Sequence, residues 1–113
     1  MKLTIDRTKW LRGEGSERSY LLRTEDGKYC CLGFFSIACG LTDEQISNIH
    51  SPMDLTDQVN DPNFEKLLEK PGNSYFAYKL MDLNDLQTIT EQGRELELTS
   101  MFAEEGIEVE FIN

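Results

Sequence analysis

The stretch that decides the fold is Cys30-Cys31-Leu32-Gly33-Phe34-Phe35-Ser36-Ile37-Ala38-Cys39-Gly40. It is the one long apolar segment of the chain, and no charged residue interrupts it. Its apolar side chains point nearly all round, which favours a short buried helix ended by Gly40; a buried strand is the competing interpretation. We therefore expect this segment to form the centre of the protein.

The segments on either side of this stretch predict a hairpin and a capped helix. Residues 20–24 are typical of a strand, Asp26-Gly27 is a hairpin turn, and residues 29–31 return as the second strand. Beyond the stretch, Thr42 and Gln45 form a capping box for a helix that we expect to reach Ile49.

The two ends of the chain have periodic patterns of different kinds. Residues 4–12 fit a helix, because Leu3, Arg7, Trp10 and Leu11 share one helical face. Residues 107–112 alternate apolar and acidic side chains, which predicts a strand with Ile107, Val109 and Phe111 facing inward.

Further helices are predicted between these ends. Asp61-Pro62 begins a short helix, because proline is favoured in the first helical position, and Pro71-Gly72 ends it. Thr90 caps a helix that extends to about Glu105. Residues 74–83 satisfy neither the helical nor the strand period.

Together these elements predict a single compact α+β domain over residues 1–113. Its small antiparallel sheet holds the hairpin near residues 20–31 and the C-terminal strand 107–112. About four helices pack on one face of that sheet.

Composition excludes several classes of protein. The 113 residues carry a net charge of −10, so the basic stripe needed for direct nucleic-acid binding is missing. No segment approaches the roughly 20 apolar residues of a membrane span, and the first residues do not resemble a signal peptide. Three cysteines cannot all pair within the chain, and the adjacent Cys30 and Cys31 seldom bridge to each other, which suits a reducing compartment. We therefore predict a cytoplasmic protein.

The charge is distributed unevenly along the chain. Residues 1–28 hold seven of the eleven basic side chains, whereas Arg94 is the sole basic residue from Leu80 to the end, among nine acids. A strongly negative C-terminal third steers a protein toward basic surfaces. The candidate binding residues in that third are Glu104, Glu105, Glu108 and Glu110.

The sequence contains few residues typical of metal sites or catalytic sites. Cys30, Cys31, Cys39 and His50 are the elements of a metal site, but their spacing does not fit structural zinc, and we predict neither metal nor cofactor. The same residues make a cysteine-dependent enzyme the first alternative, with His50 as base. Against it, an apolar setting raises the pKa of a thiol and makes it less reactive.

Trp10, Arg12 and Arg18 are candidate binding residues near the N-terminus, because Trp and Arg are enriched at interface hot spots. Trp10 would equally anchor its own segment on the core. Arg12 and Arg18 flank a glycine-rich link over residues 13–16 and, with Arg23, suggest a second alternative, a site for a small anionic ligand such as a nucleotide. They would equally neutralise the acidic C-terminal helix within the fold.

Several short motifs resemble a family of small uncharacterised proteins of tailed bacteriophages and prophages. They are Lys-Trp-Leu-Arg-Gly at 9–13, Tyr-Cys-Cys-Leu-Gly-Phe at 29–34, Leu-Asn-Asp at 83–85 and Phe-Ala-Glu-Glu-Gly-Ile-Glu-Val-Glu-Phe at 102–111. The resemblance implies a setting, the cytoplasm of an infected bacterium, and no particular chemistry. With the acidic composition, it leads us to expect a non-enzymatic accessory protein that binds a host or phage protein through a basic surface of that partner.

Overall fold

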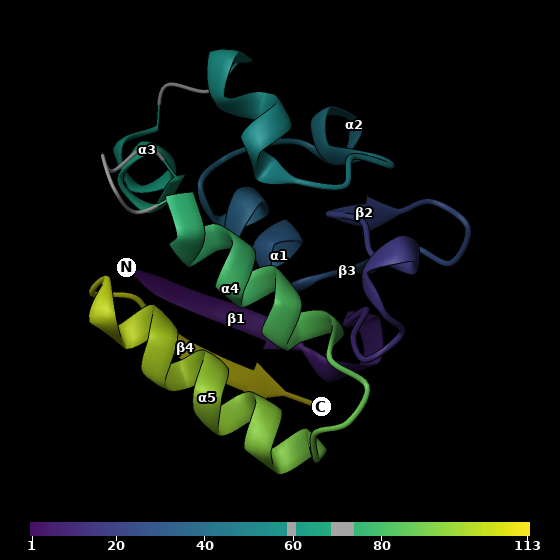
Figure 1. Cartoon of the computed structure of the whole chain (residues 1–113). Coiled ribbons are helices and arrows are strands. Elements are labelled where there is room, and N and C mark those ends of the chain that lie inside the picture. Colours follow the sequence, from purple (N-terminus) through teal and green to yellow (C-terminus); the bar gives the residue numbers. More distant parts are fainter. Residues whose placement is uncertain (59–60, 69–73) are drawn as a thin grey trace.

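The computed structural model describes residues 1–58, 61–68 and 74–113 (Figure 1). At its centre lies α1 (Cys31–Ala38), the helix expected from the apolar stretch. Its Phe35 ring is fully buried and lies 6.1 Å from the ring of Phe64 and 6.4 Å from that of Phe102, measured between centroids. The apolar stretch therefore forms the core, as predicted.

Gly33 allows α1 to touch a neighbouring segment directly. A Cβ atom at this position would lie 1.9 Å from the carbonyl oxygen of Leu21, far inside van der Waals contact. The helix backbone and the segment leading into the hairpin consequently pack without a side chain between them.

The predicted helix over residues 4–12 is wrong. Lys2–Asp6 forms strand β1, and a 3-10 turn, η1 (Arg7–Lys9), follows it. Leu3 and Ile5 are buried between exposed neighbours, which is the two-residue period of a strand. The pattern that suggested a helix joins side chains from the strand, the turn and the extended residues after it.

The C-terminal strand is confirmed as β4 (Glu108–Ile112), but its predicted partner is wrong. It pairs with β1 in parallel, with Lys2 opposite Glu108 and Asp6 opposite Ile112, and does not join the hairpin. Val109 and Phe111 face the interior and the two glutamates face outward, as the alternation predicts. β1 and β4 pair through their backbones, and the face that carries Leu3, Ile5, Val109 and Phe111 packs against the helical core.

The predicted hairpin is confirmed in shorter form. β2 (Leu22–Arg23) and β3 (Lys28–Tyr29) are antiparallel, and Gly27 takes the left-handed conformation at the turn with φ of 71°. The described part of the chain therefore holds two separate two-stranded sheets rather than one antiparallel sheet.

The remaining helices follow their capping signals closely. α2 (Asp43–Ile46) has the predicted capping box but stops before Ile49. The segment after it contains a 3-10 helix, η3 (Pro52–Gln58). α3 (Pro62–Leu68) begins as expected, with Asp61 accepting hydrogen bonds from the first-turn amides. Its predicted end at Pro71-Gly72 lies outside the described residues.

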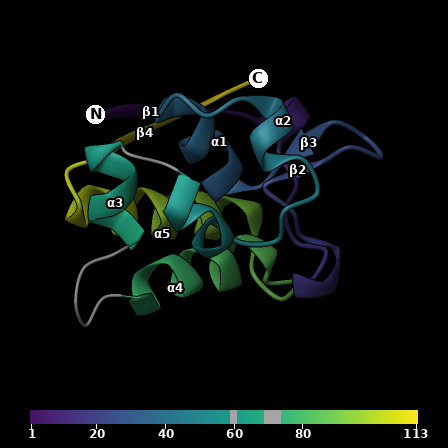
Figure 2. The ribbon, with the colours of Figure 1, turned by 90° about the horizontal axis from the view of Figure 1, so that it is seen from above.

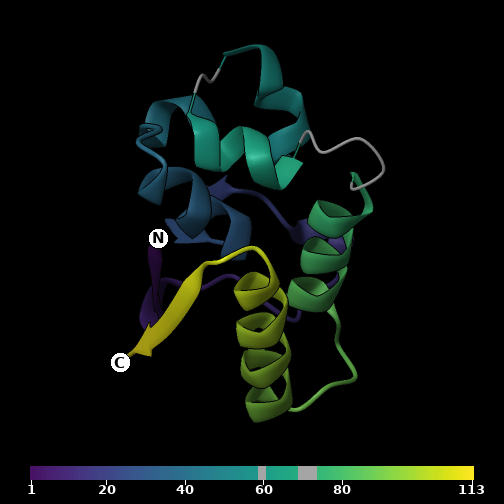
Figure 3. The same cartoon turned by 90° about the vertical axis from the view of Figure 1, so that its left-hand side faces the viewer.

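Two longer helices complete the domain. The ambiguous segment forms α4 (Ser74–Asp85), and Thr90 caps α5 (Glu91–Glu104) as predicted. α5 packs on α4 and β4, and α1 packs on α4 and β1 (Figures 1 and 3). Seen from above, β1 and β4 lie along one side, α4 along the other, and α1 between them (Figure 2). The α+β class is confirmed, and among the described helices none has the length and apolar character to cross a bilayer.

Candidate functional site

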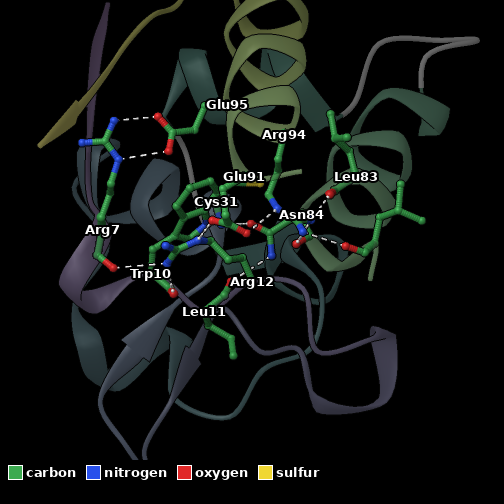
Figure 4. A network of polar contacts seen from close by, with 11 residues as sticks. Arg7, Trp10, Leu11, Arg12, Cys31, Leu83, Asn84, Glu91, Arg94 and Glu95 are labelled. Carbon is green, nitrogen blue, oxygen red and sulfur yellow. Dashed lines mark hydrogen bonds and ion pairs between the residues drawn. The ribbon is translucent and has the colours of Figure 1, made fainter. Parts of the chain in front are cut away.

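A buried polar cluster lies at the C-terminal end of α4, and Asn84 is its centre (Figure 4). The Asn84 Oδ1 atom accepts hydrogen bonds from Trp10 Nε1 at 2.8 Å and from the Cys31 amide at 3.0 Å. Its Nδ2 atom donates to the Leu11 carbonyl at 3.0 Å. One amide side chain thus joins α4, the start of α1 and the segment after β1, a structural role that sequence reasoning missed.

Arg94 closes the same end of α4 from α5. Its guanidinium donates to the carbonyls of Leu83 at 2.7 Å, Asn84 at 2.9 Å and Leu86 at 2.7 Å, so it caps the helix C-terminus with a positive charge. The side chain is 2% exposed. Arg94 is therefore enclosed and unavailable to a ligand. The sequence could have indicated its burial, because Arg94 lies on the same helical row as Leu98 and Phe102.

Asp85 lies beside this cluster and is also buried. It accepts a hydrogen bond from Asn84 Nδ2 at 3.0 Å. Burial raises the pKa of the Asp85 carboxyl, an effect that hydrogen bonds from Asn84 and Ser19 partly offset. Ionisation of this buried carboxyl therefore lowers the stability of the folded protein.

Trp10 and Arg12, two predicted binding residues, are used inside the fold. The Trp10 ring is 2% exposed, and the Arg12 guanidinium lies over it at 4.4 Å from the centroid. Arg12 also pairs with Glu91 on α5 and donates to two backbone carbonyls. Arg7 makes a bidentate pair with Glu95 one helical turn further on, at 2.6 and 3.0 Å. The N-terminal arginines thus neutralise the inner edge of the acidic helix.

The other cations near the glycine-rich link are also matched by carboxylates. Arg23 is buried and contacts Asp26 and Glu14, and Asp26 holds the pKa of the guanidinium above its ordinary value. Arg18 is 58% exposed and lies 3.4 Å from Glu14. The hollow that contains Arg18 and Arg23 has a volume of about 180 Å³. These pairs leave little uncompensated positive charge for an anionic ligand.

The cysteines lie in the settings expected for inert thiols. Cys30 and Cys31 are buried, and burial raises the pKa of Cys30 to about 12 and that of Cys31 well above its ordinary value. Cys39 is half-buried; burial, with the Asp61 carboxylate as the lesser cause, raises its pKa to about 12. A thiol with a raised pKa holds little thiolate near neutral pH and is a poor nucleophile.

His50 is engaged elsewhere. Its ring stacks on Tyr20 with centroids 4.3 Å apart, and Nδ1 lies 2.9 Å from the Ser19 carbonyl oxygen. No ring contact or hydrogen bond in the described part of the chain joins His50 to a cysteine. Across the same residues, no group of three His, Cys, Asp or Glu side chains is placed to hold a metal ion.

The predicted acidic residues Glu104, Glu108 and Glu110 are exposed on α5 and β4, and we call the exterior of these two elements the α5–β4 face. Its exposed carboxylates are Glu97, Glu104 and Glu108, none of which forms an ion pair with a described residue, and Glu110, which pairs with Lys2 at 2.9 Å. Glu105 is half-buried at the C-cap of α5 and contributes less to this face.

Uncharged side chains lie between these carboxylates on α5. Leu96 is 65% exposed on α5, and Thr99, Ser100 and Ala103 continue its row at helical spacing. A groove of about 420 Å³ follows between α5 and β4, lined by Thr99, Ala103, Gly106, Ile107, Glu108 and Val109. The α5–β4 face therefore combines free negative charge with an apolar hollow, a combination typical of protein interfaces.

A second groove, of about 400 Å³, lies on the opposite edge of the same sheet. It is lined by β1 and α1, with Phe34, Ile37 and Ala38 on the helix side and Lys2 and Lys9 at its margin. The charged residues in the lining of the groove at β1 are Lys2, Lys9 and Asp6, whereas Glu108 is the charged residue in the described lining of the groove at β4.

Comparison of the chain with protein-family models, with curated proteins and with solved structures found no match. The function is therefore argued from the geometry of the surface.

Proposed function

We propose that this protein is a non-enzymatic binding module whose α5–β4 face docks on a basic surface of another protein. One observation carries the proposal. Arg7 and Arg12 already pair with Glu95 and Glu91 on α5, whereas Glu97, Glu104 and Glu108 form no ion pair with a described residue, and Glu108 has Lys2 as an electrostatic neighbour.

Exposed carboxylates on α5 and β4, together with the apolar hollow between these elements, serve recognition in two ways. They speed the encounter with a positive surface through long-range attraction, and the hollow supplies the area that is desolvated on contact. In the setting implied by the sequence resemblance, the partner is a host or phage protein, for example one whose basic surface otherwise meets nucleic acid.

The two alternatives, a cysteine-dependent enzyme and a site for a small anionic ligand, have less support than the binding module. The thiols have raised pKa values and lie apart from His50, and the arginines near the glycine-rich link already contact carboxylates. We therefore place function on the exterior of α5 and β4.

The test removes charge from the face without changing its shape. The triple variant Glu97→Gln, Glu104→Gln and Glu108→Gln is compared with the unchanged protein for capture of partners from bacterial lysate. A captured partner is then purified, and its association rate is measured at about 0.05 and about 0.5 M salt. We expect the rate to fall at high salt and to fall in the triple variant by about tenfold or more.

The matched control is the triple variant Glu17→Gln, Glu44→Gln and Asp82→Asn. It changes the net charge by the same amount at exposed positions that form no ion pair with described residues. Equal association rates for the two triple variants, or a rate that does not change with salt, would contradict the proposal.

A further inference from the structure

β4 forms an open edge of its sheet. In the described part of the chain this sheet has two strands, and β4 has β1 on one side. The Glu108 amide donates to the Met1 carbonyl at 2.9 Å, so in a parallel ladder with this register Glu108, Glu110 and Ile112 bond toward β1. The N–H and C=O groups of Val109 and Phe111 consequently point to the opposite side.

That side of β4 opens onto the groove between the strand and α5. The groove is about 420 Å³ in volume, and its walls include Ala103 from the helix and Ile107 and Val109 from the strand. An extended segment placed along this edge would form main-chain hydrogen bonds with β4 and lay alternate side chains against apolar walls. Strand addition of this kind uses the edge for affinity and the hollow for specificity.

Charge decides which segment fits. Glu108 and Glu110 project from β4 on one face of the strand, and Glu104 is an exposed residue at the end of α5. Antiparallel pairing with β4 of a second copy would place glutamates of the two copies close together, which is unfavourable for like charges. A segment that carries Lys or Arg at alternate positions would instead place positive charge beside Glu108, since Glu110 already pairs with Lys2.

We propose that the β4 edge receives an extended segment of the partner in which Lys or Arg alternates with apolar residues. This inference rests on the proposed function and states how the partner of the α5–β4 face is held. It also distinguishes the β4 edge from the β1 edge, whose groove has lysines at its margin.

The probe is a nine-residue peptide of alternating Lys and Val with blocked ends. The control peptide replaces each Val with Pro, which keeps the charge but removes every second N–H donor, fixes φ at about −65° and changes the apolar side chains. Affinity is measured by fluorescence anisotropy, and hydrogen exchange of the Val109 and Phe111 amides is measured by NMR. We expect the Lys-Val peptide to bind about tenfold or more tightly than the Lys-Pro peptide and to slow exchange at both amides.

Two alanine variants identify the groove. Ala103→Gln narrows the groove at β4, and Ala38→Gln makes the same change in the groove at β1; both alanines are exposed on helices. We expect Ala103→Gln to weaken peptide binding by about fivefold or more and Ala38→Gln to leave it within about twofold.

The other outcomes separate this inference from the proposed function. If both peptides bind the α5–β4 face equally, charge recognition stands and strand addition is wrong. If neither peptide binds, strand addition is wrong, and the capture experiment with the triple variant tests the proposed function separately. Loss of binding in Ala38→Gln alone would assign the β1 edge. Slow exchange at Val109 and Phe111 in a concentration-dependent dimer would assign a second copy instead, and either result would overturn the inference.

Discussion

Replacing Asn84 with alanine tests whether one buried side chain joins three segments of the fold. The Asn84→Ala variant removes the oxygen that accepts from Trp10 Nε1 and the Cys31 amide, and the nitrogen that donates to the Leu11 carbonyl. All three partner residues are at most 2% exposed, so the orphaned groups do not gain bulk water in exchange.

The expected loss follows from these contacts. Each buried polar group left without a partner costs about 1 to 3 kcal/mol. Leaving three such groups without partners should therefore lower the free energy of unfolding by at least about 3 kcal/mol, and the cavity left by the amide adds to that loss. Domains are stable by about 5 to 15 kcal/mol, so the variant should fold in buffer with a greatly reduced margin.

Urea unfolding measured by far-UV circular dichroism gives the value directly. Trp10 is the one tryptophan in the chain, so its fluorescence provides a second probe at the site itself. With a slope of about 1 to 3 kcal/mol per molar urea, the midpoint should fall by about 1 to 3 M. The control Asn63→Ala, at an exposed position on α3, should change stability by no more than about 0.5 kcal/mol. A loss below about 1 kcal/mol at unchanged slope would refute the role assigned to Asn84.

The remaining predictions concern packing, pH and the thiols. Gly33→Ala forces a Cβ into the Leu21 carbonyl and should cost about 3 kcal/mol or more; an unchanged melting temperature would show that the two backbones do not touch. The folded-state pKa of Asp85 is raised, so its ionisation costs stability above the pH at which the unfolded chain ionises, about 4. Asp85→Asn should therefore match the parent below about pH 3 and exceed it in urea midpoint near pH 7; the opposite ordering would contradict a net cost of the charge. In the native protein a thiol reagent should label half-buried Cys39 slowly and the two adjacent cysteines only after unfolding, since their pKa values are raised. Rapid labelling of any thiol would support the cysteine-dependent alternative.

The local elements could be predicted well because their signals lie within a few residues. The capping box at Thr42, the Asp61-Pro62 start of α3, the Thr90 cap of α5 and the Gly27 turn are all present in the structure. Each depends on a side chain meeting a backbone group within about three or four positions, so tertiary contacts need not be known. The prediction of α1 was confirmed for a related reason. An uninterrupted apolar stretch has no polar face to present to water, so it is buried wherever the rest of the chain packs.

Residues 2–12 show where such reasoning fails. Their apolar side chains fit a helical row as well as a strand followed by a turn, and the choice depends on β4 at the other end of the chain. The candidate site shows the same limit. Arg12 and Glu108 are both charged residues in the sequence, yet Arg12 pairs with Glu91, whereas Glu108 forms no ion pair with a described residue.

The sequence by itself determined the α+β class, the buried centre and the helix caps, because these follow from local hydrogen bonding and from where apolar side chains are concentrated along the chain. Tertiary structure alone decided that β1 pairs with β4, that Asn84 and Arg94 join α4 to its neighbours, and which carboxylates remain free. These contacts join residues that are far apart in the sequence. Their energies depend on burial and distance after the chain has closed, and no local pattern encodes either quantity.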